Sequence, residues 1–366
     1  MTPAGGLAPG SSALFWEATA IFVLGYVLII SEKVHKTIVA VAGAALVLLC
    51  GILEQREAFH VEEYGVDWNV IFLLISMMVI INIIRPTGLF EYIAIRSAKL
   101  GRGEPFRILA IFAVVTAVLS ALLDNVTAVL LISPVTLLIA DALEVDPVPY
   151  LISGALASNI GGTATLIGDP PNIMIASKAQ LTFMDFVNNL TPVIVVVMGC
   201  YLLAIRLLWG CKLKTRDALK QRIMGMDERQ AIKDPALLRR SLAVLALVLA
   251  GFILHGTLHL EPATVALAGC ALLLLLSRTH DPHRLLADVE WGTIFFFIGL
   301  FIIVGGVVKV GLIEMLSRQV IALTRGSMLG TSMVMLWFSA IASAIVDNIP
   351  YVATMNPLIV DMAKQL

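Results

Sequence analysis

The feature that most constrains this chain is a duplicated polar motif inside apolar sequence. Residues 120–127 (SALLDNVT) recur as residues 343–350 (SAIVDNIP), with Asp124 and Asp347 at matching places. Flanking matches between positions 67 and 134 keep the same offset of 223 residues without a gap. An ionisable residue at membrane depth is expensive, so it indicates a functional site. Its presence in both halves of a duplicated chain is typical of secondary transporters.

The composition indicates a membrane protein. Hydrophobic residues make up 59% of the chain and charged residues 14%, and the mean hydropathy is +0.94. Soluble domains are about half apolar and about a quarter charged. We therefore predict an all-α polytopic membrane protein that meets the lipid bilayer and binds no nucleic acid. The predicted uninterrupted spans are 14–30, 37–53, 68–84, 193–209, 241–258, 262–277 and 291–308.

Three further apolar segments are interrupted by polar residues. Segments 106–142 and 328–362 are long enough to enter the membrane and return, with the Asp-Asn pair near the middle of each. We predict that both are re-entrant helical hairpins. Segment 149–175 is predicted to be a discontinuous helix, broken within the membrane. Such non-helical backbone is tolerated only where protein or a water-filled cavity surrounds it.

The positive charges predict the orientation. Stretches 31–36, 85–107, 206–240 and 278–290 hold 2, 5, 10 and 2 Lys or Arg residues, which is 19 of the 25. The positive-inside rule places these stretches in the cytoplasm. The first hairpin then enters from the cytoplasmic side and the second from the opposite side. This predicts two inverted repeats in a multi-pass plasma (inner) membrane protein.

The predicted domains follow from the duplication. Repeat 1 covers 1–210 and holds three spans, the hairpin, the broken helix and a closing span at 193–209. A basic cytoplasmic linker at 211–240 leads to repeat 2 at 241–366, which has three spans and a hairpin. For the linker we favour a tether that fixes topology over a site for anionic lipid or a partner.

The two hairpin tips supply the first candidate ligands. Asp124 can cap the second arm of its hairpin, with Thr127 in the first turn. Capping alone would be served as well by Ser or Gly, whereas a carboxylate there costs about 2.5–3.5 kcal/mol on insertion scales. We therefore favour a functional role over capping alone, for Asp347 as for Asp124. A coupling sodium ion, if present, is expected at Asp124, Asn125, Asp347 and Asn348.

The helix break supplies the second set. Paired glycines let the backbone approach a ligand closely, and Asp169-Pro170-Pro171 cannot continue a helix. No GKS or GKT follows, so the segment is not a phosphate-binding loop. Broken helices present N–H groups to anions and carbonyls to cations; the alternative is an ordinary break or a surface loop. The predicted binding residues here are Ser158, Asn159, Gly161, Gly162, Thr163, Thr165, Gly168, Asp169 and Asn172.

These motifs resemble a known family. Residues 123–127 (LDNVT), 159–172 (NIGGTATLIGDPPN) and 346–350 (VDNIP) look like the signature of the P-protein (pink-eyed dilution) branch of the ion transporter superfamily. That superfamily includes arsenite permeases, the sodium/proton antiporter D type, and sodium–dicarboxylate and citrate carriers. The resemblance covers 14–366. It implies inverted repeats, substrate and coupling ion at hairpin tips and helix breaks, alternating access, and a homodimer, since the superfamily is often dimeric.

The chain departs from the family pattern at its end. Leu366 corresponds to position 143 of the first repeat, whereas the family has a second break rich in glycine and asparagine after this point. We therefore expect either a fragment or a site that another polypeptide completes. This keeps a non-transporting membrane subunit or fragment as an alternative.

The expected function is a secondary carrier of a small anion of the arsenite, inorganic or carboxylate class. Main-chain N–H groups and the hydroxyls of Thr163 and Thr165 would hold the anion, while Asp124, Asp169 and Asp347 would hold a coupling sodium ion or proton. No other metal or cofactor is expected. The motifs contain no positive side chain, so a plain sodium/proton antiporter is the main alternative. An intramembrane enzyme is disfavoured because no Ser/Lys pair, His-Glu-x-x-His or aspartyl dyad is present.

Overall fold

The computed structural model of the protein describes residues 13–61, 64–210, 212–277 and 282–365. Throughout these ranges the chain forms helices and turns, and no strand. Seven of the described helices are long and apolar enough to cross a membrane, or up to eight if the bent pair of α16 (Leu312–Leu323) and α17 (Met328–Ser343) is one span. The predicted all-α, polytopic membrane fold is confirmed.

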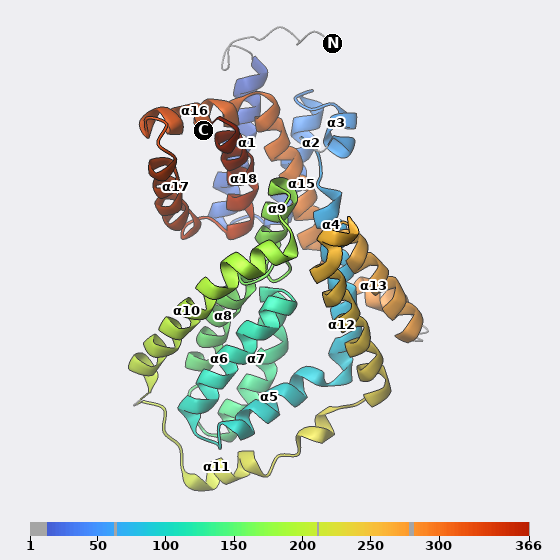
Figure 1. Ribbon diagram of the computed structural model, residues 1–366, viewed down its shortest axis with the longest axis vertical. Helices are drawn as coiled ribbons and strands as arrows, with labels where there is room; N and C mark the ends of the chain where they lie inside the picture. Colours follow the sequence, from blue (N-terminus) through green and yellow to red (C-terminus); the bar gives the residue numbers. More distant parts are fainter. Residues whose placement is uncertain (1–12, 62–63, 211, 278–281, 366) are drawn as a thin grey trace. The chain divides into compact units, whose positions relative to one another are not determined.

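The helices belong to two compact units, each described by itself (Figure 1). Unit 1 combines Met1–Ile71, Ser177–Gln180 and Glu290–Leu366, and unit 2 combines Phe72–Ala176 and Leu181–Val289. Each unit therefore draws on both predicted repeats. Unit 1 holds α1 (Ala13–Ser31), α2 (Lys36–Leu49), α3 (Gln55–His60), α15 (Trp291–Lys309), α16, α17 and α18 (Asn348–Gln365).

Unit 2 contains the longer run of consecutive helices. Two helices cross the boundary between the units: α4 (Trp68–Ile84) begins in unit 1, and α9 (Pro170–Ala179) ends there. The others are η1 (Arg85–Thr87), α5 (Leu89–Leu100), α6 (Pro105–Leu122), α7 (Asn125–Ala142), α8 (Val148–Gly162), α10 (Phe183–Trp209), α11 (Asp217–Met224), η2 (Glu228–Ala231), α12 (Pro235–Leu258), α13 (Pro262–Ser277) and α14 (Pro282–Ala287).

The duplication extends from sequence to helix boundaries. The starts of α4, α5, α6 and α7 at positions 68, 89, 105 and 125 recur as the starts of α15, α16, α17 and α18 at 291, 312, 328 and 348. The glycines before α5 and α16 have left-handed backbones, with φ of 83° at Gly88 and 82° at Gly311. Only glycine adopts such angles without strain. The helix starts thus recur with the offset of the sequence motif, while the division into two repeats and the inversion of one copy relative to the other stay predictions.

Both predicted hairpins consist of two helices joined by a turn that ends in an aspartate. The arms α6 and α7 contain 18 residues each, which is about 27 Å of helix. A bilayer core is about 30 Å thick, so arm length alone does not set the depth of the tip. The re-entrant depth stays a prediction.

One predicted span is shorter in the structure. Segment 37–53 was expected to be helical throughout, but α2 ends at Leu49. The chain closes this helix with a Schellman motif, in which Gly51 N–H donates to Leu48 O and Ile52 N–H donates to Val47 O. Gly51 takes the left-handed φ of 69° that this motif needs. The apolar residues that follow α2 misled the prediction.

Another span is longer than predicted. The closing span was expected at 193–209, whereas α10 begins at Phe183. A capping box starts it: Asp185 N–H donates to the Thr182 hydroxyl at 3.2 Å, and Thr182 N–H donates to the Asp185 carboxylate at 2.8 Å. Reciprocal bonds of this kind satisfy two otherwise unpaired donors of a first turn. Hydropathy alone excluded this polar first turn.

The core of unit 2 lies between α6, α7 and α8, which pack side by side (Figure 1). Ile108, Leu109 and Phe112 of α6 meet Ile139 of α7 in this cluster, and all four are buried. The helices α6 and α8 approach each other closely at Gly161 of α8, where an added Cβ would lie 2.1 Å from the carbonyl oxygen of Ala117. Glycine at this point lets two helix backbones touch.

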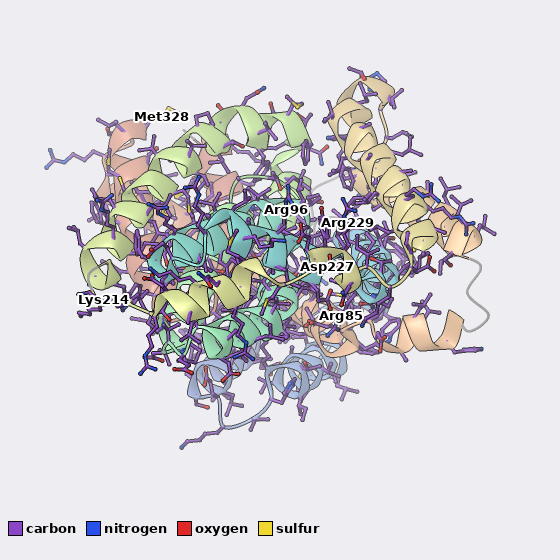
Figure 2. The ribbon with its side chains drawn as sticks, turned by 90° about the horizontal axis from the view of Figure 1, so that it is seen from below. Arg85, Arg96, Lys214, Asp227, Arg229 and Met328 are labelled. Carbon is purple, nitrogen blue, oxygen red and sulfur yellow. The ribbon has the colours of Figure 1, made fainter. Side chains whose placement is uncertain are left out.

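The linker is bound along unit 2. Lys220 Nζ lies 2.8 Å from Glu104, and Lys233 N–H donates to Thr87 O at 3.0 Å. An added Cβ at Gly88 would lie 1.7 Å from the carbonyl oxygen of Ala231. Figure 2 shows this segment beside α5, with Asp227 and Arg229 on the segment and Arg96 on α5. The linker is bound to the helices of unit 2, and its cytoplasmic location stays a prediction.

Glu228 forms two ion pairs that bind this linker to α5. Its carboxylate lies 2.6 Å from Lys99 Nζ and 2.9 Å from Arg96 Nη1, both on α5. The Lys99 ammonium, a backbone N–H and the Arg96 guanidinium lower the pKa of Glu228 to about 2. The carboxylate is therefore ionised over the whole physiological range of pH.

Candidate functional site

The first candidate site forms at the tip of the α6–α7 hairpin in unit 2. Leu123 and Asp124 join the two helices, and Asp124 takes an extended backbone as the N-cap of α7. Its Oδ1 accepts a hydrogen bond from Thr127 N–H at 2.7 Å, and Asn125 Oδ1 accepts one from Val126 N–H at 2.9 Å. The predicted capping contact is thus confirmed. It uses only part of the acceptor capacity of the Asp124 carboxylate.

The predicted helix break is also present in unit 2. Between α8 and α9, residues 163–169 form turns and bends. Asn172 holds this turn closed, because its Nδ2 donates to Gly162 O at 3.0 Å and to Thr165 O at 2.8 Å. An added Cβ at Gly168 would lie 2.4 Å from Gly162 O. The glycines and Asn172 therefore shape the break itself.

The tip and the break contact each other through polar side chains. Asn125 Nδ2 donates to Asn159 Oδ1 at 2.9 Å, and the Ser120 hydroxyl donates to Ser158 O at 2.7 Å. The Thr165 hydroxyl donates to the carbonyl of Ala121. We call the group the first half-site. It contains Asp124, Asn125, Thr127, Ser158, Asn159, Gly161, Gly162, Thr163, Thr165, Gly168, Asp169 and Asn172.

Many donors at the first half-site already have internal partners. The Thr163 hydroxyl donates to Asn159 O at 2.9 Å, and the Thr165 hydroxyl is bound as described above. Pro170 and Pro171 have no N–H, so the first turn of α9 lacks two donors that a helix start would otherwise offer. The two threonine hydroxyls would have to exchange partners to donate to an anion. The Asp124 carboxylate, whose Oδ1 accepts from Thr127 N–H, has further acceptor capacity, and carboxylate oxygens suit a hard cation.

The second candidate site lies in unit 1 at the tip between α17 and α18. This tip is longer than its copy, with residues 344–347 between the two helices. Asp347 Oδ2 lies 2.7 Å from Nζ of Lys36, the first residue of α2. Asp347 O also accepts a bond from Tyr351 N–H at 3.2 Å. Asp347, Asn348 and Lys36 form the second half-site.

Sequence reasoning missed two residues beside this tip. Lys36 was counted only as a cytoplasmic charge, and Tyr26 was read as part of a span. The Tyr26 hydroxyl donates to Pro350 O at 2.6 Å and also meets the Thr354 hydroxyl. These contacts join α1 and α2 to the start of α18. Residues more than 300 positions apart gave no local signal for such pairs.

Comparison with known proteins identifies the family. The sequence model described as "Citrate transporter" matches residues 26–366. The chain belongs to the citrate transporter family. It is therefore a member of a transporter family, not of an enzyme family.

Relatives agree with this assignment. The chain is 47% identical over 345 residues to an uncharacterized transporter of Mycobacterium tuberculosis, with 94% of this chain and 80% of the relative covered. It is 44% identical over 350 residues to the 46 kDa membrane protein of Mycobacterium leprae, covering 95% and 81%. It is 30% identical over 424 residues to the human P protein, covering 94% and 50%. The resemblance to the P-protein branch is confirmed.

Proposed function

We propose that this protein is a secondary active transporter that carries a small anion across the membrane by alternating access, driven by sodium ions or protons. The observation that carries the proposal is the bond between Asn125 and Asn159, which joins a hairpin tip to a helix break. Polar residues inside apolar membrane helices are expensive, so their presence indicates a function. Membership of a transporter family supports the same conclusion.

A carboxylate is the first substrate class to test, because the family is described as citrate transporters. Arsenite and inorganic anions are the other classes that the motifs suggest. In this proposal the first half-site binds the coupling ion through Asp124 and Asn125. The basic linker 211–240 lies in the cytoplasm and the protein spans the plasma (inner) membrane, as the distribution of Lys and Arg favours. A homodimer is part of the same proposal.

The decisive experiment is a flux screen with the purified chain in liposomes. Uptake of labelled citrate, phosphate and arsenite is measured with and without an inward sodium gradient, at two pH values. We expect one anion to accumulate only when sodium or protons flow inward. Uptake no greater than in protein-free liposomes under every condition would contradict the proposal.

A sodium/proton antiporter is the second candidate. It is favoured by the first half-site, whose twelve residues include two acids and no Lys or Arg. The same liposomes distinguish it when a pH-sensitive dye is enclosed. Sodium-driven proton exchange that needs no added anion would favour the antiporter, whereas exchange that requires the anion would favour the carrier.

A further inference from the structure

We propose that Lys36 is the positive charge of the substrate site and that it changes partner during transport. In this proposal, which rests on the proposed function, Lys36 neutralises Asp347 while the site is empty. When a proton or sodium ion binds Asp347, the Lys36 ammonium is released to bind a carboxylate group of the substrate. The ion pair thereby couples the cation to the anion.

The position of Lys36 is fixed by three helices of unit 1. Its Nζ lies 2.7 Å from Asp347 Oδ2, at the start of α18, and 5.2 Å from the centroid of the Phe296 ring of α15. Phe296 is fully buried, so the ring is a rigid face for the ammonium group. Tyr26 holds the next turn of α18 through Pro350 O. The lysine and its partner are therefore held in place by elements that are themselves packed.

The pair is built to be exchanged. The side chains of Lys36 and Asp347 are 42% and 38% exposed, and ion pairs with such exposure are weak. A lysine ammonium has three donors, and Asp347 accepts from one of them at hydrogen-bonding distance.

Electrostatics explains why a cation must arrive first. The motifs at 120–127, 158–172 and 343–350 contain no Lys or Arg, so the fold has to bring a positive charge from elsewhere. While Asp347 is ionised, it repels an approaching carboxylate and competes for the ammonium. A proton or sodium ion on Asp347 removes both effects. The anion then binds only when the coupling ion is present.

Several other charged or titratable groups lie on the helices packed around α18 and in the loop before α2. The Tyr351 hydroxyl donates to Ser339 Oγ of α17 at 2.7 Å, and the α17 sequence carries no charged residue. Arg318 and Glu314 of α16 pair with each other. The remaining groups on α1, α2, α15 and α18 are Glu17, Tyr26, Lys309 with its partner Glu57, Asp361 and Lys364. The residues just before α2 and α15 add Glu32, Lys33, His35 and Glu290.

The test compares two lysines of the same unit. Lys309 forms an ion pair with Glu57 at 2.6 Å, and their side chains are 31% and 25% exposed, so Lys309→Gln removes a similar pair away from the tip. We expect Lys36→Gln to raise the KM for citrate uptake in liposomes by about tenfold or more. Lys36→Arg should recover most of the affinity, and Lys309→Gln should behave as the unchanged protein. Equal KM values for Lys36→Gln and Lys309→Gln would overturn the inference.

Asp347→Asn tests the exchange step in the same assay. With no carboxylate beside Lys36 to neutralise, we expect citrate to bind with less help from sodium or protons, while the first half-site still binds its ion. The sodium and pH dependence of the KM should therefore be weaker than in the unchanged protein. A variant that keeps the dependence of the unchanged protein would show that the coupling ion acts elsewhere, and would overturn the exchange.

A binding measurement separates this inference from the proposed function. Lys36 and Lys309 are labelled in the Asp347→Asn protein with an amine-reactive ester, and the labelling is read by mass spectrometry. Added citrate should slow labelling of Lys36 several-fold and leave Lys309 unchanged, even if the liposomes show no flux. Citrate flux without protection of Lys36 would contradict only the role proposed for Lys36. Protection of Lys36 without flux would contradict only the transport proposal.

Discussion

Asp124 has two possible roles, and a pair of substitutions separates them. In the structure Thr127 N–H donates a capping bond to Asp124 Oδ1 at 2.7 Å. Asn caps helices about as well as Asp, whereas replacing a cap with Ala lowers stability by about 1 kcal/mol, within a range of about 0.5–2. Asp124→Asn should therefore leave stability almost unchanged. Asp124→Ala should lower the free energy of unfolding by about 1 kcal/mol.

Transport should respond differently. If the carboxylate binds the coupling ion, both substitutions remove the charge and both should reduce driven uptake by at least about tenfold, which is about 1.4 kcal/mol of lost interaction. Stability is measured by thermal unfolding in detergent, and uptake in liposomes with a sodium or proton gradient. The contrast between the two readouts is the signature of a charge that does more than cap a helix.

Asp234 supplies the matched control. It caps α12 by accepting bonds from Ala236 N–H and Leu237 N–H at 3.0 and 2.9 Å. Asp234→Ala should lose about as much stability as Asp124→Ala while its uptake stays normal. If Asp124→Asn carried anions as well as the unchanged protein does, the charge would be dispensable and Asp124 would be a cap only.

Three further predictions concern the packing of unit 2. Gly161→Ala should destabilise the protein by about 1–3 kcal/mol by overpacking α6 against α8. Gly154→Ala on the same helix, with no atom within 4 Å of the added Cβ, should stabilise the protein slightly. Thermal unfolding of the two variants checks this prediction. Asn172→Ala should lower the free energy of unfolding by about 1–3 kcal/mol, because the side chain is 7% exposed and closes the break. Asn189→Ala, at an exposed site, should lower it much less in the same assay. Glu228 has a lowered pKa in the folded protein, so its stabilising effect should be complete above the unfolded pKa of about 4.3 and disappear as the pH falls toward 2. The difference in melting temperature between the unchanged protein and Glu228→Gln should follow the same course. A difference that stays constant down to pH 2 would contradict this prediction.

Local signals predicted much of the fold. The duplicated motif located both hairpin turns, and the structure begins α7 and α18 directly after the two aspartates. The cap at Asp124 was predictable because donor and acceptor are three residues apart. The break was predictable because Asp169-Pro170-Pro171 cannot stay helical. In these cases the information needed lies within a few residues of the feature.

The contacts that the sequence did not reveal join distant segments. Lys36 and Asp347 are 311 positions apart, and no periodicity links them. The same holds for Glu228, which looked like one more charge in a polar linker but lies between Arg96 and Lys99 of α5. The packing of the helices decides which distant charges meet. Hydropathy does not predict this packing.

The packing of α2 against α15 has a consequence for biosynthesis. At Gly299 of α15, an added Cβ would lie 2.5 Å from the backbone of Ala40, so the two helices need each other's surfaces. The ribosome makes α15 about 240 residues after α2, which at 5–20 residues per second is roughly 10–50 s. For that interval α2 lacks the surface of α15 against which it packs in the folded protein. The small-residue face of α2, which includes Ala40 and Gly43, is then exposed to non-native contacts. The speed of synthesis therefore affects how this protein reaches its fold.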